Sequence, residues 1–228
     1  MSGMIDGRSL HVIGNPKQCD WLILQPADME ETEMVEQEAA YLKKACADIR
    51  FSMAAFTVDW WRELTPWPEK SPYKGQPDFG EGAPSLLNEV TGQLIPSLIP
   101  ESGRQPLLLL AGYSLAGLFA LWAGCQTDRF DGITAASPSL WYPGWAEYAK
   151  AHPCQAKAVY LSLGDREAKT RNPLMSTVED AIRTEYVILE RQHINSVLEW
   201  NPGNHFQEPA VRTAKGIKWI METRFHDH

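Results

Sequence analysis

Ser114 is the side chain of this sequence whose surroundings best suit a nucleophile. The apolar run 107–111 has the length of a buried strand, and apolar residues recur at helical spacing after Ser114. Gly112 and Ala116 flank the serine two residues away on either side, where a sharp strand-to-helix turn has room only for small side chains. The pattern indicates a nucleophile elbow, a turn that exposes a serine hydroxyl beyond the end of a sheet. The alternative is a buried strand–turn–helix connection with an incidental serine.

A serine hydroxyl needs a base to remove its proton, and His205 lies where such a base is expected. It follows the predicted last strand, 196–200, in a loop of Pro, Gly and Asn residues. His193 precedes the same strand and so belongs to the opposite end of the sheet. The remaining histidines lie in a predicted strand, at a helix end or in the C-terminal tail: His11, His152, His226 and His228. We therefore predict that His205 is the base, in preference to an ordinary surface histidine.

The segment 164–167 follows the predicted strand 158–163 and offers two carboxylates that could orient this histidine. In a triad on such a sheet the acid comes between the serine and the histidine in chain order. Glu167 is favoured, because the acid is expected a few residues beyond the glycine that ends the strand, while Asp165 has the place of a turn residue. The alternatives are Asp165 as the acid, or two solvated charges and a serine–histidine dyad.

Two backbone N–H groups are expected to stabilise the negative charge that forms on an attacked carbonyl oxygen. Leu115 should supply one, because it directly follows the nucleophile at the start of a helix. The second should come from the loop after the predicted strand 51–58, where Asp59 or Trp60 supplies it.

The segment 60–84 combines aromatic residues with many Pro and Gly residues, a composition that excludes a regular helix or strand. It predicts a long ordered loop near the active site, and such loops in compact domains are usually functional. Aromatic side chains here and after other strands should bind an apolar or aromatic part of a substrate. The predicted substrate-binding residues are Trp60, Trp61, Tyr113, Trp141 and Tyr142, with Trp67, Tyr73 and Trp145 nearby. The alternative, that the aromatic residues only pin the loop to the body, stays open for Trp67 and Trp145.

Predicted strands and helices alternate along the chain, which indicates an α/β fold with a mostly parallel sheet and helices on both faces. Strands are expected at 10–13, 21–25 (ended by Pro26), 51–58, 107–111, 130–136, 158–163 and 196–200. Helices are expected at 30–48, 85–98 (with Ser85 as N-cap), 115–124, 145–152, 175–192 and 208–225, after a loose start at 1–9. Ligands bind such sheets at the carboxyl ends of the strands. The length of 228 residues suits one domain, 1–228.

Composition excludes several classes of partner. The net charge of −8 and the absence of a basic cluster argue against nucleic acid. No segment resembles a signal peptide or has the length to span a bilayer, and the four cysteines lack paired spacing. We therefore expect a cytoplasmic protein with reduced thiols that acts on a small molecule. No metal or other cofactor is expected, because a serine, a histidine and an acid suffice for this chemistry without one. The oligomeric state stays open.

Three segments of the sequence resemble an esterase family of α/β-hydrolases. They are Gly-Tyr-Ser-Leu-Ala-Gly-Leu-Phe-Ala-Leu at 112–121, Phe-Asp-Gly-Ile at 130–133 and Ser-Pro-Ser-Leu-Trp at 137–141. The family includes feruloyl esterases, S-formylglutathione hydrolases, siderophore (enterobactin-type) esterases and mycolyltransferases. The resemblance extends from about the end of strand 51–58 to His205. In this family the elbow usually reads Gly-x-Ser-x-Gly-Gly, and Ala116 departs from that pattern.

The resemblance implies an α/β-hydrolase fold and serine-dependent hydrolysis of esters or thioesters without a cofactor. Because 164–167 is similar to the family's acid loop, the resemblance also favours Glu167 as the acid. It does not name the ester, since the family acts on many acyl groups. Two alternatives stay open: an acyltransferase that uses the same triad, and a non-catalytic binding protein that keeps the fold.

Overall fold

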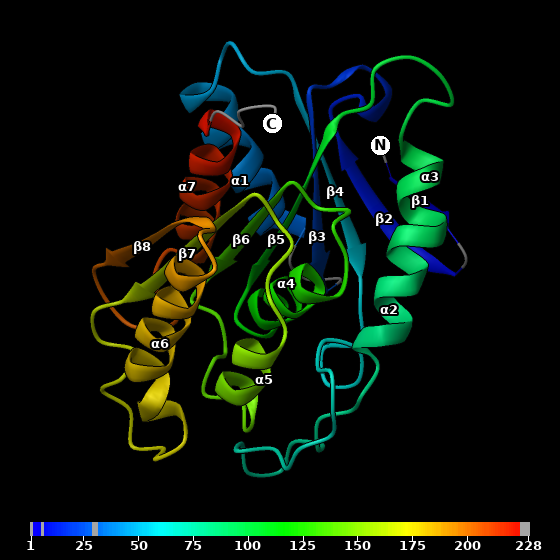
Figure 1. Ribbon diagram of the computed structural model, residues 1–228. Coiled ribbons are helices and arrows are strands. Elements are labelled where there is room, and N and C mark those ends of the chain that lie inside the picture. Colours follow the sequence, from blue (N-terminus) through cyan, green and yellow to red (C-terminus); the bar gives the residue numbers. More distant parts are fainter. Residues whose placement is uncertain (1, 6, 29–31, 224–228) are drawn as a thin grey trace.

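One eight-stranded sheet runs through the computed structural model, which describes residues 2–5, 7–28 and 32–223 (Figure 1). Its strands are β1 (Ser2–Ile5), β2 (Arg8–Ile13), β3 (Trp21–Ala27), β4 (Phe51–Thr57), β5 (Leu107–Tyr113), β6 (Gly132–Ala136), β7 (Ala158–Gly164) and β8 (Asn195–Asn201). Their order in the sheet is β1-β2-β4-β3-β5-β6-β7-β8. The six strands from β4 to β8 are parallel, and β1 and β2 are antiparallel. The predicted mostly parallel sheet is confirmed.

The prediction of a loose start at 1–9 is wrong. β1 and β2 form a hairpin in which Ser2 pairs with His11 and Ile5 with Arg8. The hairpin then extends the sheet by pairing β2 with β4. The Arg8 side chain fixes this edge, since its guanidinium lies 3.0 Å from Glu63 and 2.7 Å from Glu89. Sequence periodicity could not reveal a strand that depends on such distant partners.

Pro26 does not end the third strand as predicted. β3 continues to Ala27 and stays paired with β4 along its whole length. Its pairing with β5 ends earlier, at Leu24. Pro26 therefore lies beyond the β5 ladder, in a part of the strand where one side is already unpaired and a proline is tolerated.

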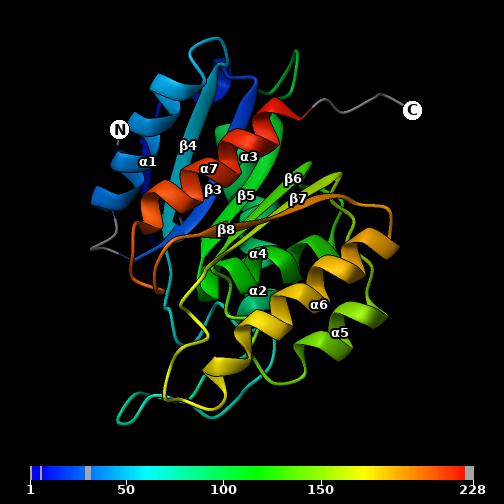
Figure 2. The ribbon, with the colours of Figure 1, turned by 90° about the vertical axis from the view of Figure 1, so that its left-hand side faces the viewer.

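Two groups of helices cover opposite faces of the sheet, as predicted (Figure 2). α1 (Thr32–Ala45) and α7 (Pro209–Glu222) pack on one face, and their apolar stripes form one core cluster. The other face carries α2 (Ala83–Glu89), α3 (Ile95–Leu98), α4 (Leu115–Gln126), α5 (Trp145–Ala151) and α6 (Val178–Arg191). Short 3₁₀ turns occupy Pro16–Gln18 and Met175–Thr177. The predicted helix ends at 30–31 and 224–225, and the tail histidines His226 and His228, lie outside the described residues.

The single helix predicted at 85–98 is interrupted. α2 begins at Ala83 with Gly82 as its N-cap, so Ser85 is not the cap. A π-helical turn at Val90–Leu94 separates α2 from α3. Pro96 stands near the start of α3, and its missing N–H removes one i→i−4 hydrogen bond. A widened turn just before a proline accommodates that loss.

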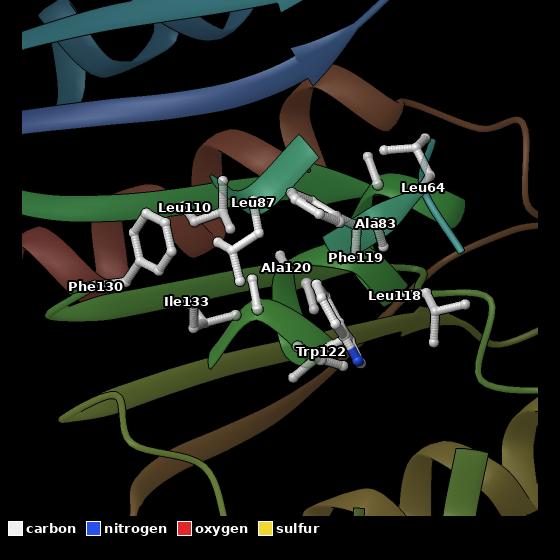
Figure 3. Close-up of a cluster of buried hydrophobic side chains, with 14 of the residues drawn as sticks. Leu64, Ala83, Leu87, Leu110, Leu118, Phe119, Ala120, Trp122, Phe130 and Ile133 are labelled. Carbon is white, nitrogen blue, oxygen red and sulfur yellow. The ribbon is translucent and has the colours of Figure 1, made fainter. Parts of the chain in front are cut away.

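α4 is the helix on which the site depends, and it is buried from Leu115 to Gly124. Such all-round burial identifies a helix enclosed between the sheet and other helices. Figure 3 shows Leu118 and Trp122 of α4 in the same cluster as Leu110 of β5 and Ile133 of β6. This packing holds the N-terminus of α4 firmly against the end of β5.

Glu185 of α6 is a buried carboxyl whose ionisation should weaken the fold. It accepts a hydrogen bond from Trp145 Nε1 at 2.9 Å, and burial raises its pKa from 4.5 to about 7. Because the unfolded chain releases this proton first, the free energy of unfolding falls as pH rises from 4.5 through 7.

We expect Glu185→Gln to remove this fall, since glutamine can still accept the Trp145 hydrogen bond. The variant should gain about 2 kcal/mol over the wild type between pH 5 and pH 8. Urea unfolding at both pH values measures the difference. Parallel stability curves for the two proteins would contradict it.

Candidate active site

Ser114 stands at a sharp turn between the last residue of β5 and the first residue of α4. Its backbone has φ 56° and ψ −120°, a conformation that a non-glycine residue keeps only where the surroundings enforce it. A Cβ atom on Gly112 would lie 2.2 Å from the carbonyl carbon of Ala116, so glycine is required there. That contact is with the backbone of Ala116, which explains why alanine fits where the resembling family has glycine.

The structure brings Ser114, Glu167 and His205, which follow β5, β7 and β8, into one chain of contacts. His205 Nε2 lies 3.1 Å from Ser114 Oγ. His205 Nδ1 lies 2.8 Å from Glu167 Oε2. One ring nitrogen thus faces the hydroxyl and the other faces the carboxylate, the arrangement of a serine–histidine–acid triad.

Asp165, the other candidate acid, does not approach His205. Its Oδ1 accepts the N–H of Gly203 at 2.8 Å, and its own N–H donates to the carbonyl of Asn201. Asp165 therefore joins the turn after β7 to the loop after β8, the turn role that the sequence suggested.

The Glu167 carboxylate is buried and fully engaged. Its Oε1 accepts hydrogen bonds from Ser137 Oγ at 2.6 Å, from the N–H of Gly164 at 2.7 Å and from Arg212 Nη1 at 2.9 Å. Burial favours the protonated form, but the hydrogen bond and charge of His205, with the bonds from Ser137 and Gly164, outweigh it. The pKa of Glu167 is therefore held below its usual range, and the acid is ionised at neutral pH.

Arg212 is the residue of the site that sequence reasoning missed. It is 2 % exposed, lies in the first turns of α7, and pairs with Glu167 at 2.9 Å. Its Nη2 also donates to the carbonyls of Pro202 and Asn204, at 2.9 and 3.0 Å, in the loop that carries His205. The only signal in the sequence is a single arginine on the buried face of a predicted helix. That signal does not show which residue the arginine pairs with.

Tyr113 and Ser139 also take positions that the sequence did not reveal. Tyr113 was predicted to bind substrate, but its hydroxyl donates to the carbonyl of His205 at 2.6 Å and it does not line the cavity described below. Successive strand residues point to opposite faces, so Tyr113 points away from the face that Ser114 presents. Ser139 Oγ lies 3.2 Å from Ser114 Oγ.

Two backbone N–H groups at the cavity make no hydrogen bond within the described part of the protein. Within the described residues, the N–H groups of Leu115 and Trp60 have no hydrogen-bond partner, and both residues line the cavity that contains Ser114. Asp59, the alternative to Trp60, is not available, because its N–H donates to Glu63 Oε2 at 2.6 Å. The arrangement therefore favours Leu115 and Trp60 as the pair.

A cavity of about 790 Å³ opens over Ser114 and His205, within the usual size of small-molecule sites. Trp60, Trp61 and Tyr73 of the loop 60–84 line part of it. Within that loop, Glu69 and Phe79 form an isolated β-bridge, and Trp61 stacks on Phe79 with ring centroids 5.4 Å apart.

No profile of a known protein family and no curated protein matches this sequence, but many solved structures share its arrangement. An IroE-like serine hydrolase from Shewanella oneidensis superposes with a TM-score of 0.76 at 18 % identity, over 94 % of this chain and 76 % of that one. Siderophore hydrolase EstA from Aspergillus nidulans gives 0.75 at 18 %, over 97 % and 92 %. A ferulic acid esterase gives 0.64 at 12 %, over 94 % and 92 %. The chain has the α/β-hydrolase fold.

Within this α/β-hydrolase fold, two further predicted substrate-binding residues, like Tyr113, do not line the cavity. Trp141 and Tyr142 are 6 % and 2 % exposed. Trp141 packs against Tyr73 and Phe79, and the Tyr142 hydroxyl donates to the carbonyl of Trp67 at 2.6 Å. Both therefore hold the loop 60–84 against the body, because large aromatic side chains gain more from burial than from exposure at a cavity wall.

The two aromatic residues whose role the sequence left open also pack. Trp67 Nε1 donates to the carbonyl of Pro143 at 2.9 Å, and Trp145 is buried against Glu185. Neither lines the cavity.

The described residues of this α/β-hydrolase fold hold no cluster of three or more His, Cys, Asp or Glu side chains that could bind a metal ion. In the same part of the chain, no helix is long and apolar enough to cross a membrane.

Proposed function

We propose that this protein is a serine hydrolase that cleaves carboxylic esters or thioesters of small molecules through an acyl-enzyme on Ser114. The observation that carries the proposal is the contact chain from Ser114 through His205 to Glu167, which opens into the cavity. Solved proteins that share the fold include siderophore hydrolases and a ferulic acid esterase, and ester hydrolysis on this site is consistent with them.

The geometry supports each step of that reaction. His205 Nε2 takes the hydroxyl proton as Ser114 Oγ attacks the carbonyl carbon, and the ionised Glu167 stabilises the imidazolium that forms. The N–H groups of Leu115 and Trp60 receive the oxyanion, each stabilising the transition state by about 3 kcal/mol. His205 then gives its proton to the leaving oxygen or sulfur. A water, activated by the same histidine, releases the acid and restores Ser114.

The cavity wall indicates what the substrate carries. Trp60, Trp61 and Tyr73 offer large flat apolar faces, which suit an apolar or aromatic group on a small ester.

A fluorophosphonate probe tests the proposal, because it reacts with serines activated by a histidine. We expect the probe to label the wild-type protein on the peptide that contains Ser114, and to leave Ser114→Ala unlabelled. Ser139→Ala is the matched control, since Ser139 Oγ lies only 3.2 Å from Ser114 Oγ. A wild-type protein that stays unlabelled, or a label on Ser139, would refute the proposed nucleophile.

Hydrolysis should need no metal ion, because the serine, histidine and acid supply every step described above. We expect the rate of p-nitrophenyl acetate hydrolysis to be the same before and after dialysis against EDTA. Activity that disappears on dialysis and returns with zinc would contradict this.

A further inference from the structure

The cavity carries an excess of positive charge in a chain whose net charge is −8. Its described lining includes three cations, Lys74, Arg166 and Lys169, and a single acid, Glu167. Both carboxylate oxygens of that acid are already occupied by ion pairs within the protein. A ligand that enters the cavity therefore meets three cations and no free carboxylate on this lining.

Two of these cations have no acidic partner of their own. Among the described residues, no carboxylate lies within ion-pair distance of Lys74 or Lys169. Arg166 has a distant one, Asp165 Oδ1 at 3.9 Å, and that oxygen already accepts a backbone N–H. By contrast Lys70, on the same loop as Lys74, pairs with an aspartate at 2.5 Å. The charges of Lys74 and Lys169 are thus left without an acidic partner, while that of nearby Lys70 is paired.

The three cations converge because two loops meet at the cavity. Lys74 belongs to the loop 60–84, and the other two belong to the segment that follows β7. Asn172 Nδ2 of that segment donates to the carbonyl of Pro72 at 3.2 Å. Figure 2 shows the two loops together beyond the end of the sheet. The three positive charges therefore lie together at the opening of the cavity.

The position of Arg166 relates this charge to one part of the substrate. In ester hydrolysis the histidine gives its proton to the leaving oxygen, so the alcohol portion lies beside His205. The N–H of Arg166 donates to the carbonyl of Gly203 at 3.0 Å, two residues before His205. Phe206 is 87 % exposed and sets its ring edge-on to His205, with ring centroids 5.4 Å apart. The space beside His205 thus has Phe206 and the loop of Arg166 as neighbours.

We propose that this site selects esters whose alcohol portion bears a negatively charged group, a carboxylate or a phosphate, bound by Arg166 and Lys169 with Lys74 across the mouth. This inference rests on the proposed hydrolase function. The side chains of all three cations are exposed, so each should favour the anionic substrate by a factor of about three. Screening by salt should reduce that preference.

The test compares three acetate esters with nearly the same shape: para-acetoxybenzoate, para-acetoxyphenyl phosphate and the neutral para-acetoxybenzamide. The measured quantity is the ratio of kcat/KM for each anionic ester to kcat/KM for the amide. We expect Arg166→Gln/Lys169→Gln to lower that ratio about tenfold. Lys150→Gln, an exposed lysine on α5 away from the cavity, should leave it unchanged. Rising NaCl should lower the ratio of the wild type more than that of the double variant, which keeps Lys74 alone.

A ratio that is equal in the wild type and the double variant, for both anionic esters, overturns the anion site. If the probe still labels Ser114 in that case, the hydrolase proposal stands. If none of the three esters is hydrolysed and Ser114 is not labelled, both proposals fail. A larger fall for one ester than for the other supports the site and identifies the preferred anion.

Discussion

Replacing Ser114 by alanine should lower kcat/KM for p-nitrophenyl acetate by about 10⁴-fold or more, with little change in Tm. The loss follows because His205 then has no hydroxyl to activate and no acyl-enzyme can form. Stability should be kept, because alanine and serine bear a similar strain at the positive φ of this elbow. Kinetics and thermal unfolding of the purified variant measure both quantities.

Ser139→Ala is the control for that variant. It removes a hydroxyl at 3.2 Å from Ser114 Oγ but leaves the contact of Ser114 with His205 in place. We expect it to keep most of the activity. If Ser114→Ala kept its activity and Ser139→Ala lost it, the nucleophile would be Ser139 and the assignment of Ser114 would be wrong.

Glu167→Gln should be the second most damaging change, with a loss of several orders of magnitude in kcat. An amide in place of the carboxylate can stabilise the wrong tautomer of His205 and no longer stabilises the imidazolium. Circular dichroism must accompany the kinetics, since the variant leaves the charge of Arg212 without its partner.

Asp165→Asn is the matched control, because it removes the other carboxylate of the same segment. Asparagine can still accept the N–H of Gly203, so the turn after β7 should persist. We expect kcat to change little. A large loss in Asp165→Asn with normal turnover in Glu167→Gln would reverse the choice of acid.

Those contacts of the site could be predicted from sequence whose residues are placed by the order of strands along the chain and by the residues next to them. Ser114 is surrounded by its own strand and helix, and His205 and Glu167 each follow a strand that ends at the same edge of the sheet. In a parallel sheet those ends meet. The alternation of strands and helices therefore placed the segments that carry these residues at one edge of the sheet, while the choice of Glu167 over Asp165 rested on the triad template and the family resemblance.

Arg212 could not be predicted because nothing near it in the chain requires an arginine. Its role depends on Glu167, 45 positions away, and on the loop before His205. The same holds for Trp141 and Tyr142, whose burial against the loop 60–84 depends on how that loop folds back. Sequence spacing shows that aromatic residues lie near a strand end, but it does not show which of them face a cavity.

Detection of an acyl group on Ser114 during turnover tests the central claim most directly. The wild-type protein is mixed with p-nitrophenyl acetate, quenched in acid within the first turnovers and mapped by mass spectrometry. We predict one acetyl group on the peptide that contains Ser114 and none in Ser114→Ala. In a variant that lacks His205 and is acylated with a more reactive ester, we predict that the acyl group on Ser114 lives longer than in the wild type. Steady hydrolysis without any acetyl group on Ser114, or with the group on another residue, would contradict the account.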